Sequence, residues 1–157
     1  MGDKFEWKDL GKFWDTLIAT ASERDNQKRK FKSSRYYNEK SHFIGLCGEM
    51  TYSIITGLKP DLTLRLLGDG GLDFPDTDVK ATEYWKDPYL KENPDAAFVA
   101  RFYVLVAIDT IQKRGRVCGW ASRTDVQNAP LKNWGQGPRR SLHESCLRKT
   151  TKDDLRG

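Results

Sequence analysis

The sequence has no apolar run long enough to cross a lipid bilayer. Its longest apolar stretch is Phe102–Ile108, whereas a membrane-spanning helix needs about 20 consecutive apolar residues. The first ten residues, MGDKFEWKDL, contain no apolar segment of the signal-peptide type. We therefore expect a cytoplasmic protein without a membrane partner.

Cysteine is also scarce, and its distribution argues against a disulfide-stabilised fold. The three cysteines, Cys47, Cys118 and Cys146, are odd in number and far apart in the sequence. His143 and Cys146 form an H-x-x-C pair, but no C-x-x-C accompanies it, so a zinc site is not expected. Cys47 and Cys118 are more simply explained as core residues.

The chain is rich in charge, and the charge is unevenly placed. Of its 157 residues 31% are charged and 38% hydrophobic, which suits one domain with a core of moderate size. Residues 1–40 carry 10 basic and 7 acidic side chains, residues 41–128 carry 10 and 12, and residues 129–157 carry 7 and 3. An acidic middle between basic ends fits a protein that holds a cation centrally and contacts a polyanion at its margins. Two solvated basic faces would explain the same distribution.

Hydrophobic periodicity predicts an α/β order of elements. A helical stripe covers residues 6–22, and a largely apolar second helix covers residues 41–57, with Ser41 as its N-cap and Gly57 as its stop. Short strands are expected at residues 62–67, 72–74, 78–82, 97–108 and 115–121. The fourth of these is nearly all apolar, as expected of a central strand, and the fifth is expected to pair with it.

The remaining segments are expected to be less regular. Residues 84–94 contain two prolines and many charges, which predicts a loop or a poorly formed helix, while residues 122–127 favour a short helix. We expect one domain in three parts, which are an N-terminal helix and basic segment (1–40), a core (41–125) and a basic, largely irregular tail (126–157).

The segment from Gly68 to Thr82 holds the residues best suited to chemistry. If Pro75-Asp76 forms the tip of a hairpin, Asp73 lies directly opposite Asp78, and Lys80 follows two residues later on the same face. Directly opposed side chains have Cβ atoms about 5 Å apart, so the two carboxylates would repel unless a cation lies between them. A divalent cation resolves that repulsion, because hard ions such as Mg²⁺ prefer carboxylate oxygens.

The register of this turn decides the arrangement. With Pro75-Asp76 at the tip, Phe74 faces Thr77 across the turn. Proline does not adopt the positive φ of a tight two-residue hairpin, so a longer turn with a shifted register is an alternative. A slip of one residue would place Asp73 and Asp78 on opposite faces. Ordinary turn acids beside an exposed lysine would also explain the pattern.

Glu49 stands inside the apolar helix expected at residues 41–57. Its neighbours one turn away are Gly45 and Ser53, and Gly48 is adjacent, so this face of the helix is small and could approach a sheet closely. A lone buried carboxylate costs several kcal/mol, so Glu49 needs a partner, and a metal held by acids on the strands would serve. An exposed Glu49 on a partly exposed helix face is the alternative.

Together these features resemble the PD-(D/E)xK nuclease superfamily. The matching segments are Gly48-Glu49 on the helix, Gly71-Leu72-Asp73-Phe74 on a strand and Asp78-Val79-Lys80-Ala81-Thr82 on the next strand. The resemblance covers roughly residues 41–125, and it implies a restriction-endonuclease-like αβββαβ core with a small mixed sheet flanked by helices.

The resemblance also implies a site and a reaction. Glu49, Asp73 and Asp78 would bind Mg²⁺ or Mn²⁺, and Lys80 would assist the water that attacks phosphorus in DNA. Asp76, preceded by proline, competes with Asp73 as the first strand acid, and Asp69 is a third candidate. Asp73 is preferred because Asp76 and Asp78 would lie on one strand rather than across two.

Two basic segments are candidates for contacts with the DNA backbone. Their residues are Lys28, Arg29, Lys30, Lys32 and Arg35 near the N-terminal helix and Arg139 and Arg140 in the tail. We expect a metal-dependent nuclease of the phage, junction-resolving or repair kind, a homodimer being one arrangement, with no small-molecule organic cofactor. The alternative is a catalytically silent module with this fold that binds nucleic acid or a protein partner.

Overall fold

The computed structural model describes residues 7–30, 39–57, 74, 76–96, 98, 100–135 and 137–149, and for residues 24–30 and 39–41 it describes the backbone alone. In chain order the elements are β1 (Lys8–Asp9), a 3₁₀ turn (Gly11–Phe13), α1 (Trp14–Lys30), α2 (Glu39–Thr56), β2 (Thr77–Thr82), β3 (Tyr89–Glu92), β4 (Phe102–Asp109), β5 (Arg114–Ser122), α3 (Arg123–Gln127), β6 (Leu131–Asn133), β7 (Pro138–His143) and a second 3₁₀ turn (Glu144–Cys146). No helix within these ranges is long and apolar enough to span a membrane.

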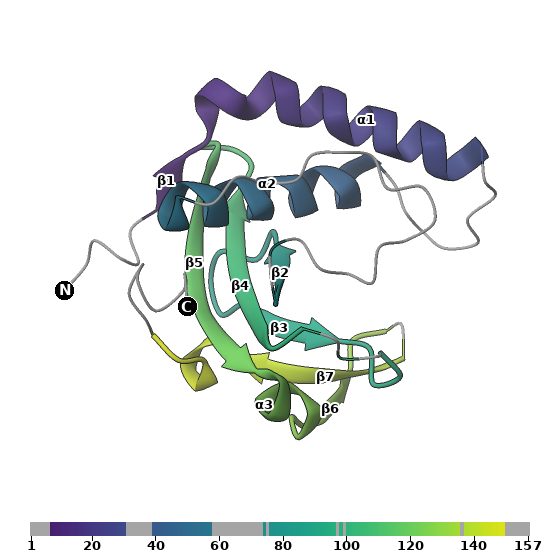
Figure 1. Ribbon diagram of the computed structural model, residues 1–157, viewed down its shortest axis with the longest axis vertical. Helices are drawn as coiled ribbons and strands as arrows, with labels where there is room; N and C mark the ends of the chain where they lie inside the picture. Colours follow the sequence, from purple (N-terminus) through teal and green to yellow (C-terminus); the bar gives the residue numbers. More distant parts are fainter. Residues whose placement is uncertain are drawn as a thin grey trace.

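The strands form two sheets in separate layers (Figure 1). Sheet A has four strands in the order β1-β5-β4-β2, and it is mixed, because β2 runs parallel to β4 while the other pairs are antiparallel. Sheet B has three antiparallel strands in the order β3-β7-β6. The predicted α/β class with a small mixed sheet is therefore confirmed at this level.

The two faces of sheet A are covered differently. Helices α1 and α2 pack on one face, where Leu17 and Leu46 join Val104 and Val106 in one apolar cluster. Sheet B and α3 cover the other face, where Leu90 of β3 is fully buried against β4 and β5. The molecule thus has three layers, which are the two long helices, sheet A, and sheet B with the short helix α3 (Figure 1).

The predicted N-terminal helix begins later and extends further than its apolar stripe suggests. Lys8 and Asp9 pair with β5, and the Leu10 backbone N–H donates to the Lys113 carbonyl at 2.8 Å, so these residues belong to sheet A. The α-helix starts only at Trp14 and continues to Lys30. The second helix is confirmed, but it begins at Glu39, so Ser41 lies inside it and is not its N-cap. Gly57 follows its last turn with a φ of +80°, which a glycine adopts at no steric cost.

The central hairpin and the helix after it are confirmed. β4 lies inside sheet A and pairs with β5, as predicted from their apolar sequences. It begins at Phe102 rather than at residue 97, and Phe98 has a φ of +54°, which is not strand geometry. α3 begins with a capping box, in which the Ser122 hydroxyl accepts from the Asp125 N–H at 3.1 Å and the Asp125 carboxylate accepts from the Ser122 N–H at 3.0 Å. Cys47 and Cys118 are buried as expected, and burial raises the pKa of Cys47 to about 12 and that of Cys118 to about 11.

Two segments that were expected to be irregular form strands, and these strands pair with each other. Residues Tyr89–Glu92, predicted as loop or poor helix, form strand β3, and the tail contributes strands β6 and β7. β3 pairs with β7, with Tyr89 opposite His143. Each strand is too short to show a period of its own, and a partner about fifty positions away supplies the hydrogen bonds that stabilise it.

Helix α2 contacts β2 through Gly48, and this contact yields a stability prediction. A Cβ atom at Gly48 would lie 2.7 Å from the Ala81 Cβ, whereas one at Gly45 would meet nothing within 4 Å. We expect Gly48→Ala to lower the free energy of unfolding by about 1–3 kcal/mol because the helix must move off the sheet. Gly45→Ala should raise it by about 0.5–1 kcal/mol through helix propensity alone. Urea unfolding of both variants tests the contact, and equal stabilities would contradict it.

The capping box of α3 yields a pH-dependent prediction. The hydrogen bond from the Ser122 backbone N–H lowers the pKa of Asp125, with Arg148 acting in the same direction. The stabilisation is therefore present above the pKa of the unfolded chain and is lost as the pH falls through the folded value. We expect Asp125→Ala to cost about 1 kcal/mol at pH 7 and clearly less at pH 3, measured by urea unfolding. An equal loss at both pH values would show that the carboxylate is not involved.

Candidate functional site

Strand β2 carries two of the predicted site residues on one face. Because side chains alternate along a strand, Val79 and Ala81 point toward the helices, and Asp78 and Lys80 point toward sheet B. The Lys80 ammonium lies 3.1 Å from the Asp78 Oδ2. The D-x-K pattern therefore produces a close pair on a strand of sheet A.

A third member of this cluster comes from sheet B. Glu92, the last residue of β3, places its Oε2 3.2 Å from the Lys80 Nζ, so the ammonium lies between two carboxylates. The three side chains are only partly accessible, at 29% for Lys80, 15% for Asp78 and 12% for Glu92. Sequence reasoning missed Glu92 because it expected residues 84–94 to be a loop or a poor helix.

The cluster keeps Lys80 positively charged. Burial by itself lowers the pKa of Lys80, but the charges and hydrogen bonds of Asp78 and Glu92 outweigh this effect and raise it above its usual value. Lys80 therefore acts as a fixed cation and hydrogen-bond donor rather than as a proton acceptor. The trio still has one negative charge in excess, which makes its surroundings favourable for a further cation.

The Tyr103 side chain lies against this cluster on the neighbouring strand β4, opposite Asp78 in the parallel register. Burial raises the pKa of the Tyr103 hydroxyl, and the charges of Glu92 and Asp78 raise it further. The positive charges of Lys80 and Arg123 act in the opposite direction and lower it. Arg123 is the first residue of α3, and its Nε donates to the Ala100 carbonyl at 2.9 Å.

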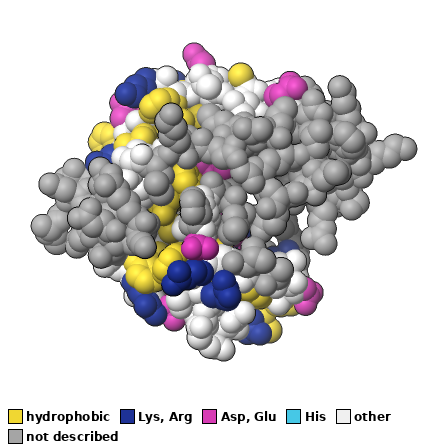
Figure 2. All heavy atoms as spheres, in the orientation of Figure 1, with side chains coloured by type: hydrophobic (Ala, Val, Ile, Leu, Met, Phe, Trp, Pro, Cys, Tyr) yellow, Lys and Arg dark blue, Asp and Glu magenta, His cyan; other side chains and the backbone are white. Residues whose placement is uncertain are grey.

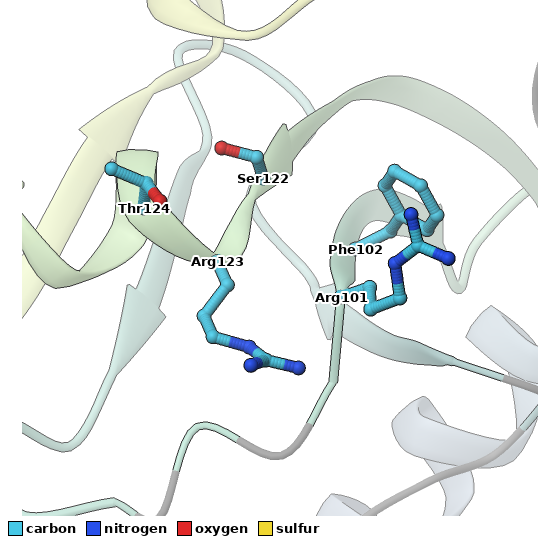
Figure 3. A pocket seen from close by; sticks show the side chains of 5 residues that line it. All are labelled: Arg101, Phe102, Ser122, Arg123 and Thr124. Atoms are coloured by element: carbon cyan, nitrogen blue, oxygen red, sulfur yellow. The ribbon is translucent and has the colours of Figure 1, made fainter.

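An open hollow of about 400 Å³ adjoins Arg123. Its lining comes from the start of β4 and from the junction of β5 and α3, and consists of Arg101, Phe102, Ser122, Arg123 and Thr124. Figure 3 shows Arg101 beside the Phe102 ring and Arg123 on the other side of the chain that leads into β4. Two guanidinium groups at one hollow make it suitable for an anion such as a phosphate.

Glu49 is buried, at 6% exposure, so the alternative of an exposed helix residue is wrong. It follows Gly48, the residue of α2 that meets Ala81 of β2. Helix α2 thus brings Glu49 to β2 from one face of sheet A, while Asp78 and Lys80 lie on the other. The structure brings the last two together directly, whereas Glu49 belongs to the helix that packs on the other face of sheet A.

The turn before β2 has the predicted register, but its first acid lies outside the described residues. Phe74 pairs with Thr77, and the Thr77 N–H donates to the Phe74 carbonyl at 3.0 Å. Asp73, like Asp69, lies outside the described residues. The competitor Asp76 occupies the turn with a φ of +59°, and its exposed carboxylate lies 4.0 Å from Arg101. Within the described ranges no group of three or more His, Cys, Asp and Glu side chains is placed to share one metal ion.

The predicted DNA contacts are distributed over two regions. Lys28, Arg29 and Lys30 lie in the last turn of α1, where only the backbone is described, and Lys32 and Arg35 lie outside the described residues. Arg139 and Arg140 lie on β7, and as neighbours on a strand they point to opposite faces of sheet B. Arg140 is partly buried and donates to the Ala129 carbonyl at 2.9 Å, so only Arg139 points away from sheet A.

In comparisons with known proteins, no family model matches the chain, and no curated protein or solved structure matches it either.

The ion cluster makes a testable contribution to stability. Lys80→Met leaves Asp78 and Glu92 facing each other, and we expect it to lower the free energy of unfolding by about 2 kcal/mol at pH 7, between the values of exposed and buried ion pairs. The two carboxylates repel each other in the folded variant. The loss should therefore shrink at pH 4, where a proton removes the repulsion.

Urea unfolding at both pH values measures this difference. The exposed Lys86 provides a matched control, since Lys86→Met removes an equal charge outside the cluster. If Lys80→Met lowers the free energy of unfolding equally at pH 4 and pH 7, charge does not hold the cluster together. The same conclusion follows if Lys80→Met and Lys86→Met lower it by the same amount.

Proposed function

We propose that the protein is a metal-dependent nuclease with a restriction-endonuclease-like core, which hydrolyses phosphodiester bonds in DNA. The proposal rests on one observation above all, the Asp78 carboxylate and the Lys80 ammonium 3.1 Å apart on one face of a strand. A carboxylate that binds a cation and a cation that binds a phosphate are then side by side. This is the pairing that phosphodiester hydrolysis by an activated water requires.

Lys80 has the role of a charged donor in this reaction. Its ammonium neutralises negative charge that develops on the phosphate oxygens, and it orients the attacking water by hydrogen bonding. Glu92 is a positioning residue, because it holds Lys80 from the side opposite Asp78 without a role of its own at phosphorus. Two carboxylates around one ammonium also keep the lysine charged at neutral pH.

The acids of the site would hold the metal. Asp78 would bind Mg²⁺ or Mn²⁺ together with Asp73, the strand acid predicted from the sequence, and the ion would polarise the water and a phosphate oxygen. Glu49, the third predicted acid, would have to reach this ion around β2, which is the outermost strand of sheet A among the described residues. The excess of negative charge around Lys80 supports a divalent cation here.

The arrangement of elements supports the proposed core only in part. Helix α2 covers β2, β2 runs parallel to the inner strand β4, β4 pairs with β5, and α3 follows. This order agrees with much of an αβββαβ core. Strand β3 departs from it by joining β7 in sheet B, where it brings Glu92 to the site.

The hollow between Arg101 and Arg123 supports a substrate with more than one phosphate. Arg123 lines the hollow, and its charge acts on the Tyr103 hydroxyl, as do the charges of the Asp78–Lys80–Glu92 cluster. A phosphate bound at either guanidinium group would add a second phosphate contact to the one at Lys80.

Cleavage assays test the proposal directly. Plasmid, single-stranded and branched DNA are incubated with the protein in Mg²⁺, Mn²⁺ or EDTA. We expect cleavage only with metal, and a loss of about 100-fold or more in Asp78→Asn and Lys80→Met, since each removes a charge at the reacting phosphate. Glu92→Gln should lose less and keep the wild-type Mg²⁺ requirement, because it acts through Lys80.

Asp95→Asn is the matched control, because Asp95 is exposed shortly after β3. Melting curves identify the temperature at which every variant is folded. Undiminished cleavage in Asp78→Asn and Lys80→Met would refute the site. Absence of cleavage of every substrate, with DNA affinity retained, would favour the silent binding module instead.

A further inference from the structure

The outer face of sheet B is a surface that the proposed reaction does not use. Leu90 and Leu142 point into the core between the sheets, so Tyr89, Lys91 and the neighbouring residues of β7 point outward. We define the aromatic-basic face as the outward side chains of this sheet and its adjoining loops, namely Tyr84, Tyr89, Lys91, Lys132, Trp134 and Arg139.

Two aromatic rings of this face, Trp134 and Tyr89, are held in place by specific contacts. The Trp134 indole N–H donates to the Ser141 hydroxyl at 3.0 Å, and the Tyr89 ring meets Trp134 edge-on with centroids 4.9 Å apart. The His143 ring lies 5.0 Å from Tyr89 on its other side. Trp134 nevertheless remains 38% exposed, and Tyr84 at the margin is 69% exposed. These are large apolar groups positioned at the surface rather than in the core.

Basic side chains lie on these rings. The Lys91 Nζ is 4.0 Å from the Trp134 ring centroid, and the Lys132 Nζ is 4.8 Å from the same centroid and 4.4 Å from that of Tyr89. Burial lowers the pKa of Lys91, and the charge of Lys132 lowers it further, so the two ammonium groups repel each other. The face therefore concentrates positive charge on an aromatic surface.

The described residues do not neutralise this charge. Within them, no carboxylate lies at ion-pair distance from Lys91, Lys132 or Arg139. Figure 2 shows several Lys and Arg side chains, in dark blue, at the surface in the lower part of the view, where Figure 1 shows sheet B and α3. An anionic partner would relieve the repulsion, and the flexible lysine stems allow the ammonium groups to turn from the rings to that partner.

We propose that the aromatic-basic face binds single-stranded nucleic acid, with bases stacked on Trp134, Tyr89 and Tyr84 and phosphates paired with Lys91, Lys132 and Arg139. Aromatic rings stack on bases whose flat sides are free, which a duplex hides within its own stack. Alternation of rings and ammonium groups matches the alternation of bases and phosphates along a strand. A purely electrostatic duplex contact would not need the exposed rings.

The position of β3 links this face to the proposed active site. Lys91 lies on the outer side of the strand and Glu92, its neighbour, on the inner side beside Lys80. A strand bound on the outer face and passing around β3 would reach the Asp78–Lys80–Glu92 cluster. The inference that the substrate contains a single-stranded region rests on the proposed nuclease function. The binding of single strands to this face does not depend on that function.

Binding is tested with the full chain in EDTA, so that cleavage plays no part. Fluorescence anisotropy of a labelled oligo(dT), at several salt concentrations, gives the affinity, and unlabelled duplex DNA and oligo(U) of equal length serve as competitors. We expect single strands to compete better than duplex DNA. DNA and RNA single strands should compete equally well, because the face would contact only bases and phosphates, which both contain.

Two variants separate stacking from charge. Trp134→Ala should weaken oligo(dT) binding about tenfold, since it removes one stacking ring. Lys91→Gln combined with Lys132→Gln should reduce the slope of log affinity against log salt by about 1.4, which corresponds to two phosphate contacts on a single strand. Lys113→Gln, at the distant β4–β5 turn, removes one charge outside the face and should leave oligo(dT) affinity within twofold of wild type.

Melting curves verify that each variant is folded, and the double lysine variant preserves the test if Trp134→Ala unfolds. Unchanged oligo(dT) affinity in both folded variants, as expected if the face serves a protein partner, would overturn the proposal. Tighter binding of duplex than of single strand would overturn it as well. If the protein cleaves DNA but the variants bind oligo(dT) as the wild type does, only the proposed single-strand binding is refuted. If the variants weaken oligo(dT) binding but the protein cleaves no DNA, only the nuclease proposal is refuted.

Discussion

The position of Lys80 between Asp78 and Glu92 connects the two sheets of this molecule. Asp78 and Lys80 belong to sheet A and Glu92 to sheet B, so one ammonium group links both layers at 3.1 and 3.2 Å. Removing two carboxylates from water is favourable only when a cation compensates them, and the lysine supplies that compensation. The close approach of β3 to β2 at this point, and with it the shape of the candidate site, depends on this ion cluster.

The opposite face of β2 is under a different constraint. There α2 lies so close that only a glycine fits at position 48, against Ala81. One strand therefore has a dry, closely packed face toward the helices and a charged face toward sheet B. Glu49 comes from the helix on the first of these faces, and Asp78 points from the strand toward sheet B on the second. Both carboxylates are therefore largely buried, although the protein is small.

Much of the core and half of the site were predictable, because both depend on local order. The period of two in β2 placed Asp78 and Lys80 on one face, the apolar run around Val104 predicted the inner strand, and Ser122 predicted the start of a short helix. Glu92 and the aromatic-basic face were not predictable. Their strands β3, β6 and β7 have three to six residues each and gain stability only from one another.

The sequence by itself determined which side chains lie together when they are two to five positions apart. The pair Asp78–Lys80, the turn from Phe74 to Thr77 and the capping box at Ser122 are all of this kind, because backbone geometry fixes short separations. Only the tertiary structure decided that Glu92 completes the cluster around Lys80. That contact depends on the pairing of β3 with β7 and on the packing of sheet B against sheet A, and neither has a signature in local sequence.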